Sequence, residues 1–328
     1  MAYNYSYGTA TNSANLLSLL NTFVVTTCGW TLHDDQSGGS PAYYVWTSAG
    51  ESGKEAIYIR CTYGTTDGLV LTAYRYWDNA AHVGYQASPA YAVTTYGIWS
   101  DHDASFNYFL FGDLDRIAVV TKTVGSVYYF ASFGIVTSVW SRNIAVSANS
   151  ETAGSSVVIE VDITTPFTVN QYYGIVNGNN ATGDYERIQV TAINPGVSIT
   201  ATIAGNHPAG AIIGEDPQPN YINRYSSTTS VYLIGPTGTA AQTHSLFVSG
   251  SFTPVIVTDP DARQNYTWLF PLMAYQSVAQ EYRGNLKEIY ATGGSNLSSE
   301  DTVTVGSDVY KCFNSSSYGW IAIKEQTV

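Results

Sequence analysis

Most of the chain consists of strand-length runs of β-branched and aromatic residues that are separated by turn residues. The clearest pair of runs occupies residues 117–124 and 127–136 and is joined by Gly125 and Ser126. Two such runs with a short glycine-containing turn between them are typical of a β-hairpin. The sequence therefore predicts a hairpin at this place, in the centre of a sheet.

Alternation along this hairpin predicts that both of its faces are apolar. One face carries Ile117, Val119, Val127 and Tyr129. The other face carries Tyr128 and Phe130. Because a strand with two apolar faces needs an apolar neighbour on each, we expect the domain's own sheet to cover the first face. We expect an adjacent subunit to cover the second, with Tyr128 and Phe130 at the contact.

One helix is predicted, near the N-terminus. The residues that repeat at the spacing of a helical face are Leu16, Leu19, Leu20 and Phe23. Ser13 is a suitable N-cap for a helix over residues 14–23, and Gly29 follows its end. Nearly all other patterned segments, such as residues 57–62 and 69–74, alternate with a period of two and predict antiparallel strands.

The middle of the chain has the pattern of a separate small β domain. Short aliphatic strands from residue 156 to residue 203 alternate with turns rich in Asn, Gly and Pro. The polar segments 147–150 and 215–219 flank them. We expect residues 150–220 to be a small barrel or sandwich inserted into a discontinuous, sandwich-like β domain formed by residues 1–148 and 222–280.

The C-terminal segment, residues 281–328, predicts a third unit. Its runs at residues 303–305, 309–313 and 321–324 are separated by a Gly-Ser-Asp turn and a loop, which is the pattern of a β-meander. The expected fold class is therefore mainly β, with a discontinuous antiparallel domain, an inserted small β domain, a C-terminal meander and one helix.

Composition narrows the class of partner. Only 12% of the residues are charged, against about 25% in an ordinary soluble domain, and 27 residues are tyrosine. A net charge of -12 would repel a phosphate backbone, so we expect no nucleic-acid ligand. No stretch approaches the roughly 18 apolar residues of a membrane span, and the N-terminal residues lack the pattern of a secretory signal. Cys28, Cys61 and Cys312 fit no ligand spacing and are expected to be buried free thiols.

Motifs for chemistry are weak throughout. The segment 50–55 resembles a phosphate-binding loop, but Ser48 stands where its first glycine belongs and Glu55 replaces the magnesium-binding hydroxyl. The acidic and histidine clusters that could bind a metal are at residues 33–35, 101–103, 113–115 and 259–261, and none has a recognised ligand spacing. We therefore expect no metal, no cofactor and no catalytic residues, although a pair of glycosidase carboxylates needs no local signature.

Three sets of segments resemble motifs of tailed-bacteriophage virion proteins. The first is Gly-Glu-Ser-Gly at residues 50–53 followed by an aliphatic strand, and the second is an aromatic run at residues 108–111 that leads to Arg116 and the hairpin. The third comprises barrel-like segments at residues 167–172, 185–190 and 207–211. The chain departs from the pattern in having one arginine before the hairpin instead of two.

The resemblance implies a structural component of the virion, without catalytic residues, in the tail as part of the baseplate, tail tip or fibre attachment. We expect several copies in a ring or trimer, other virion proteins as partners, and synthesis in the host cytoplasm. A neck or collar protein is an alternative. A carbohydrate-binding, receptor-recognising protein is another, because the stretch 74–79 has the aromatic and polar make-up of a sugar site. The expected interface or glycan-contact residues are Tyr74, Tyr76, Trp77, Tyr128 and Phe130.

Overall fold

The computed structural model describes residues 3–51, 53, 57–64, 68–74, 76–85, 97–137, 143–176, 185–214, 220–223, 230–234, 242–247, 269–276, 281–293, 297–316 and 319–327. In these residues the fold is mainly β and antiparallel, with one α-helix, as the sequence predicts. Within the described residues, no helix is long and apolar enough to cross a membrane.

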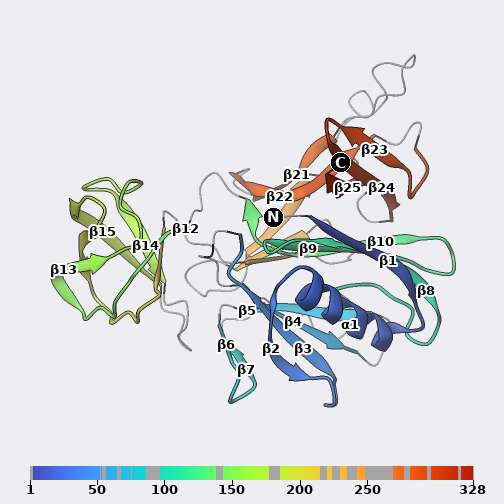
Figure 1. Cartoon of the computed structure of the whole chain (residues 1–328), viewed down its shortest axis with the longest axis horizontal. Coiled ribbons are helices and arrows are strands. Elements are labelled where there is room, and N and C mark those ends of the chain that lie inside the picture. The colour runs from blue at the N-terminus through green and yellow to red at the C-terminus, as the bar shows by residue number, and fades with distance from the viewer. Residues whose placement is uncertain are drawn as a thin grey trace.

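Counted over the described residues, the largest sheet has 13 strands and contains the first and the last strand (Figure 1). Its path is β1 (Asn4–Ala10), β8 (Phe106–Gly112), β9 (Arg116–Lys122), β10 (Tyr128–Gly134), β18 (Asn220–Asn223), β19 (Ser230–Ile234), β20 (Gln242–Phe247), β21 (Leu269–Gln276), β22 (Glu281–Thr292), β25 (Gly319–Thr327), β24 (Asp308–Ser315) and β23 (Thr302–Val305), with β11 (Val136–Thr137) beside β22. A parallel bridge from Tyr128 to Ser315 brings the last part of the sheet back over the first.

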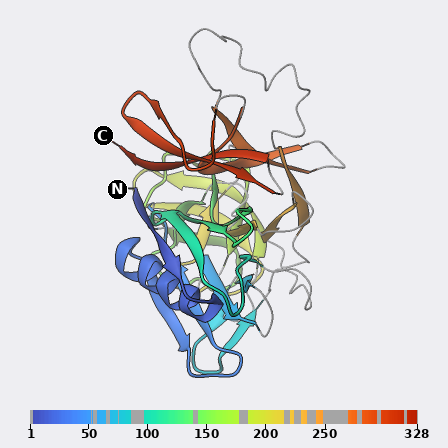
Figure 2. The same cartoon turned by 90° about the vertical axis from the view of Figure 1, so that its right-hand side faces the viewer.

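A second sheet and a helical segment cover the other face of the first part. This sheet comprises β2 (Thr31–Gln36), β3 (Tyr43–Ser48), β4 (Ile57–Tyr63) and β5 (Leu69–Tyr74), and the hairpin of β6 (Tyr76–Asp78) and β7 (Val83–Tyr85) follows it. Helix α1 (Ser13–Thr22) continues into the π-helical turn η1 (Phe23–Thr27). The result is three layers, with β1 and β8–β10 in the middle (Figures 1 and 2).

The predicted helix is present, but its N-cap is Asn12 and not Ser13. The Asn12 side chain accepts a hydrogen bond from the Asn15 backbone at 2.8 Å. The side chain of Asn15 in turn accepts one from the Thr11 backbone at 3.1 Å. Ser13 is already helical, and its hydroxyl lies 2.8 Å from that of Ser100 in a buried contact. The tertiary contact with the loop at residue 100 therefore uses the side chain that the sequence assigned to the cap.

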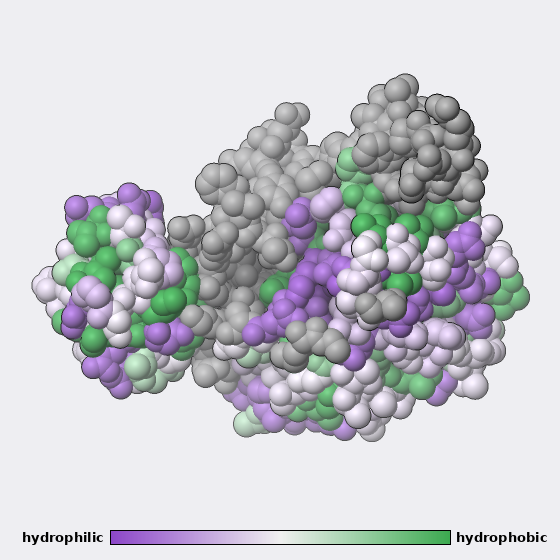
Figure 3. Space-filling view, turned by 45° about the horizontal axis from the view of Figure 1, so that its top comes forward, coloured by the Kyte–Doolittle hydropathy of each residue, from purple (hydrophilic) through white to green (hydrophobic). Residues whose placement is uncertain are grey.

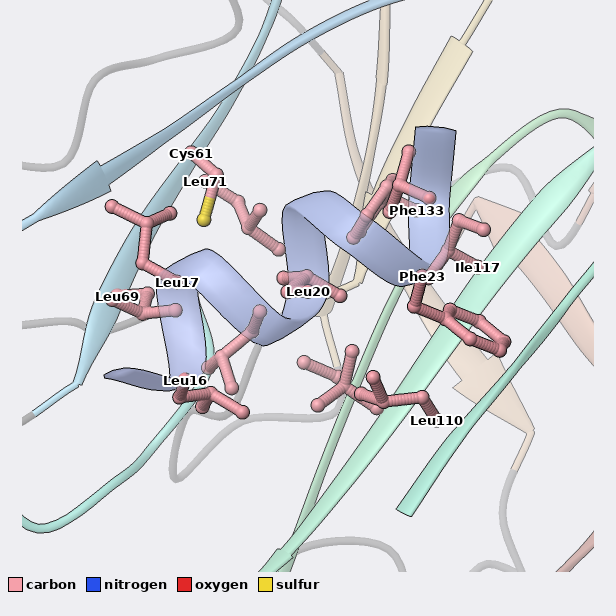
Figure 4. Close-up of a cluster of buried hydrophobic side chains, with 14 of the residues drawn as sticks. Leu16, Leu17, Leu20, Phe23, Cys61, Leu69, Leu71, Leu110, Ile117 and Phe133 are labelled. Atoms are coloured by element: carbon pink, nitrogen blue, oxygen red, sulfur yellow. The ribbon is translucent and has the colours of Figure 1, made fainter. Parts of the chain in front are cut away.

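The predicted hairpin is strands β9 and β10, which pair from Tyr128 opposite Lys122 to Gly134 opposite Arg116. On one of its faces, Val119 and Phe133 belong to a core that they share with α1 and the second sheet. Figure 4 shows Leu16, Leu20 and Phe23 of the helical segment in this core, together with Leu110 and Ile117. Ile117 and Val119 of the first face are thus covered within the chain, as predicted. The prediction is wrong for Val127, which is 37% exposed, and Tyr129 is not part of this core.

The second face of the hairpin is covered by the chain's own C-terminal strands, and the expectation of an adjacent subunit there is wrong. Phe130 and Tyr128 lie in a second core with Phe313 and Ile323 of β24 and β25. Phe130 is fully buried. Alternation predicts that a face is apolar but contains no information on which segment covers it, and here that segment is far along the chain.

The described residues between 143 and 214 form a six-stranded sheet with its own core. Its order is β12 (Asn143–Val146), β17 (Ile212–Gly214), β14 (Tyr172–Val176), β15 (Tyr185–Asn194), β16 (Ser198–Ile203) and β13 (Gly154–Glu160). Ile159, Ile175 and Val190 are buried within it, and Figure 1 shows it beside the rest of the chain. Strand β12 precedes the predicted boundary at residue 148, while the division into domains stays a prediction.

The C-terminal meander is present as β23–β24–β25, and its strands belong to the large sheet because β25 pairs with β22. On the face that Figure 3 shows, hydrophilic and hydrophobic residues are mixed. Figure 3 shows purple, pale and green residues interspersed, with pale residues over much of the body. This pattern agrees with a composition rich in small and uncharged polar residues.

Candidate functional site

Four of the five residues predicted to make interface or glycan contacts are buried inside the chain. Tyr74, Tyr128 and Phe130 are buried, and Trp77 is only 1% exposed. The indole N–H of Trp77 donates a hydrogen bond to Asp34 Oδ2 at 2.9 Å. These side chains cannot stack on a sugar or a neighbouring protein without unfolding of the cores. Tyr76 lies in β6, and its side chain falls outside the described residues.

The cluster at residues 33–35 is organised around the buried carboxylate of Asp34. Besides Trp77, His82 Nδ1 lies 2.8 Å from Asp34 Oδ2 and Gln36 Nε2 donates to Oδ1 at 3.2 Å. Burial alone would raise the pKa of Asp34, but these hydrogen bonds outweigh it and hold the pKa below its ordinary value. The neighbouring His33 instead lies 3.1 Å from the backbone oxygen of Trp77. Asp34 therefore fixes the β6–β7 hairpin against the second sheet.

The cluster at residues 101–103 makes a short chain of hydrogen bonds. His102 lies between Asp103 Oδ1, 2.7 Å from Nδ1, and the Tyr63 hydroxyl, 2.8 Å from Nε2. No group of three or more His, Cys, Asp or Glu side chains suited to a metal ion occurs in the part of the chain that the structure describes. The pair Asp259 and Asp261 lies outside that part.

Cys28, Cys61 and Cys312 are buried free thiols, as the sequence predicts. Burial raises the pKa of all three, that of Cys312 to about 12. These thiols are therefore protonated at neutral pH.

The acidic pair at residues 113–115 belongs to an ion-pair cluster, the charged junction, formed by Glu51, Asp113, Asp115 and Lys287. Lys287 Nζ lies 2.6 Å from Asp115 Oδ2, 2.9 Å from Glu51 Oε2 and 3.3 Å from Asp113 Oδ2. Burial alone would lower the pKa of Lys287, but the three carboxylates raise it above its ordinary value. The oxygens that a calcium ion would need are thus directed at a lysine.

Arg116 is fully buried at the edge of this junction. Its Nη2 donates a hydrogen bond to the Tyr3 hydroxyl, and its guanidinium carbon lies 5.0 Å from the centre of the Tyr3 ring. Burial raises the pKa of Tyr3. The Asp113 carboxylate accepts the backbone N–H groups of Asp115 and Arg116 at 2.9 Å and 3.0 Å and so shapes the turn between β8 and β9. The junction thus joins this turn to β22, and Arg116 connects the turn to Tyr3, the residue before β1.

The exposed aromatic side chains lie elsewhere, on strand β1, which we call the tyrosine edge. Tyr5 is 39% and Tyr7 61% exposed. Their ring centres are 6.1 Å apart, and the Tyr7 ring lies 6.3 Å from that of Phe109. Lys311 Nζ is 5.9 Å from the Tyr7 ring. Within the described residues, β1 pairs with β8 alone and is therefore one end of the large sheet.

Sequence reasoning missed the tyrosine edge. The alternation of Tyr5 and Tyr7 with small residues was available as a signal of a strand. The sequence contained no signal that this strand lies at the end of a sheet, because that position depends on pairings with distant residues.

In comparisons with known proteins, no family model matches the chain and no curated protein shows significant similarity to it.

Proposed function

We infer that the chain is a structural component of a tailed-phage virion, in the tail, and that it acts through assembly and not through catalysis. The observation that carries the assembly role is the tyrosine edge, where a strand without charged residues carries two exposed aromatic rings. Aromatic side chains are enriched and charged ones depleted at the centres of protein interfaces. This edge replaces the buried Trp77 and Phe130 as the candidate contact surface.

The assignment to a virion rests on the resemblance of the sequence motifs. One feature of the structure supports treating two of these motifs as parts of the same unit. The Gly-Glu segment at residue 51 and the turn that precedes the hairpin are far apart in sequence. They meet where the Glu51 backbone N–H donates to Asp115 Oδ1 at 2.7 Å and where Lys287 bridges Glu51 and Asp115. The two motifs are therefore parts of one structural unit.

Mass spectrometry and electron microscopy of purified particles test this function. We expect the chain among the proteins of virions purified from the phage that encodes it, at a fixed copy number, with density for it in the averaged tail. The proposal includes several copies in a ring or trimer, other virion proteins as partners, and synthesis in the host cytoplasm before assembly. Absence of the chain from virions that are otherwise complete would exclude the proposal, and density at the neck would favour a collar protein.

Carbohydrate binding is a second candidate, because the Tyr7 ring is exposed with Lys311 near it. Exposed aromatic rings can stack on sugars. A glycan array with the wild-type chain and Tyr7→Ala tests this function, and a hit that the substitution removes would support it. Binding that persists in Tyr7→Ala would exclude the tyrosine edge as the sugar site. Turnover of a bound polysaccharide would instead indicate an enzyme.

A further inference from the structure

The two ends of the large sheet differ in how well they are protected from further pairing. At one end, β1 has seven residues without charge or proline, and it pairs with β8 without a register shift. At the other end, β23 has four residues and lies between Asp301 and Asp308. Edge strands in soluble proteins are commonly short, charged, bulged or covered, because an open edge is a template for another strand. Of the two ends, only β23 is short and flanked by charged residues.

The backbone of β1 offers hydrogen-bonding groups as well as aromatic rings. In an antiparallel pair, every second residue turns its N–H and C=O away from the paired strand. Between Tyr5 and Thr9, every second residue therefore directs its backbone N–H and C=O groups to the side of β1 that is opposite β8. A partner that supplies one more extended strand would satisfy them.

We propose that the strand added to β1 is β1 of a second copy of the chain, paired antiparallel about a twofold axis. This inference rests on the proposed assembly function and names the partner of the same surface. A second β1 offers a strand of seven residues for pairing, whereas β23 offers only four. A twofold contact of this kind is self-complementary and closes after two copies. Such a contact can join two copies into a dimer or join two rings of copies to each other. It cannot be the contact that relates neighbouring copies around a threefold axis.

Charge favours β1 as the place where two copies meet. The chain carries a net charge of -12, so two copies repel each other over most of their surfaces. Strand β1 is uncharged, and Lys311 Nζ lies 5.9 Å from the centre of the exposed Tyr7 ring. Self-pairing there places no carboxylate opposite another carboxylate, and like charges on directly opposite strand positions are destabilising.

The alternation of β1 also selects a register. If Ser6 lies on the twofold axis, Tyr5 of each copy faces Tyr7 of the other, and Asn4 faces Gly8. All four tyrosine rings then lie on one face, next to Phe109, because Tyr7 pairs with Phe109 and Tyr5 with Phe111 in the present sheet. Cross-strand aromatic pairs are among the favourable pairs in sheets. This register therefore extends the existing stack of Tyr5, Tyr7 and Phe109 across the contact.

The experiment measures the molar mass of the full chain by light scattering and sedimentation over a range of concentrations. We expect the wild-type chain to form dimers and Tyr7→Lys to have half that mass, because lysine on an edge strand blocks pairing. Val305→Lys is the matched control, since Val305 is an exposed apolar residue on the strand at the opposite end of the sheet. It is expected to leave the dimer intact. Far-UV circular dichroism checks that each variant is folded.

A cross-link tests the register independently. Ser6→Cys places two thiols opposite each other on the twofold axis, at a strand separation that a disulfide can span. The native cysteines do not interfere because they are buried. Mild oxidation is expected to give a covalent dimer of Ser6→Cys and none of Val305→Cys.

A wild-type chain that stays monomeric at all concentrations, or a dimer that survives Tyr7→Lys, would overturn the pairing of β1 with β1. A dimer in which Ser6→Cys does not cross-link would overturn the antiparallel arrangement centred on Ser6. The proposed function fails separately. A monomeric chain that is present in virions contradicts the pairing alone, whereas a dimeric chain that is absent from virions contradicts the virion assignment alone.

Discussion

Lys287 Nζ lies 2.6 Å from Asp115 Oδ2 and so joins two positions that are 172 residues apart in the chain. Lys287 belongs to β22 in the C-terminal part of the large sheet, and Asp115 belongs to the turn before the central hairpin. The same ammonium group contacts Glu51, which lies in the connection between β3 and β4 of the second sheet. One lysine therefore holds segments from all three layers.

Replacing Lys287 by methionine is expected to lower the free energy of unfolding by about 2 kcal/mol. Removal of one partner of a buried ion pair costs about 3–5 kcal/mol, and the partial exposure of Lys287 reduces this value. Urea unfolding measures the change. Lys122→Met is the control, because Lys122 pairs with Glu300 at a more exposed place and its loss should cost less than about 1 kcal/mol. Equal losses in the two variants would show that the junction contributes no more than a surface pair.

The central hairpin shows which structural features a local sequence pattern can predict and which it cannot. Its two strands and its turn were predictable, because alternation and a Gly-Ser turn are properties of neighbouring residues. The burial of Phe130 beneath the C-terminal strands was not predictable from local pattern. Its core contains Phe313, which belongs to a meander that the sequence predicts correctly as strands but does not place. Contacts between distant segments depend on the whole topology, so the sequence identified an apolar face and misassigned the segment that covers it.

Truncating Phe313 tests whether the chain itself covers the hairpin. The Phe313 ring lies 5.1 Å from that of Phe109 and 5.8 Å from that of Tyr128, between centres. Phe313→Ala is expected to destabilise the isolated chain by about 3–5 kcal/mol, as for other buried phenylalanines. Val124→Ala, in the exposed turn of the hairpin, should change stability by less than about 0.5 kcal/mol. If the substitution at Phe313 were equally mild, the second core would not be formed in the isolated chain.

The candidate site was less predictable than the fold. Trp77 and Tyr74 have the residue types of a contact surface, but Gly84 lets β7 lie directly on the Tyr74 ring, where an added Cβ would come within 2.2 Å of the ring. The hairpin of β6 and β7 and the ring contacts of Trp77 with Tyr43 and Tyr74 bury this surface. Tyr5 and Tyr7 have the same aromatic character and remain exposed. Residue type alone does not separate the two cases, because exposure follows from sheet order.

Acid is expected to remove the contribution of Asp34 to stability. The pKa of Asp34 is lower in the folded chain than its ordinary value of about 3.9, so the carboxylate stabilises the fold fully above that pH. This contribution is lost as the pH falls through the folded-state pKa. Asp34→Asn should therefore cost about 1–3 kcal/mol at neutral pH, and its difference from the wild type should shrink in acid.

Unfolding in urea at a series of pH values measures this effect. Asp35→Asn is the matched control, because Asp35 is exposed and its carboxylate caps the backbone of Ser37 at 3.0 Å. Its effect should be smaller. A difference between wild type and Asp34→Asn that stays constant into acid would show that the Asp34 carboxylate is not stabilised by folding.

Gly134, at the end of the central hairpin, is expected to tolerate no side chain. Its φ of +137° is a conformation that other residues rarely adopt, and a Cβ there would lie 2.2 Å from the backbone oxygen of Asp115. Gly134→Ala should therefore lower the free energy of unfolding by more than about 2 kcal/mol. Gly125→Ala in the turn of the same hairpin is the control, since its Cβ would meet Val127 Cγ2 at 3.9 Å and stability should change by less than about 0.5 kcal/mol. Urea unfolding of both variants measures the difference. If Gly134→Ala were as stable as Gly125→Ala, the close approach of β10 to the turn at Asp115 would not exist in solution, and the charged junction would have a different geometry.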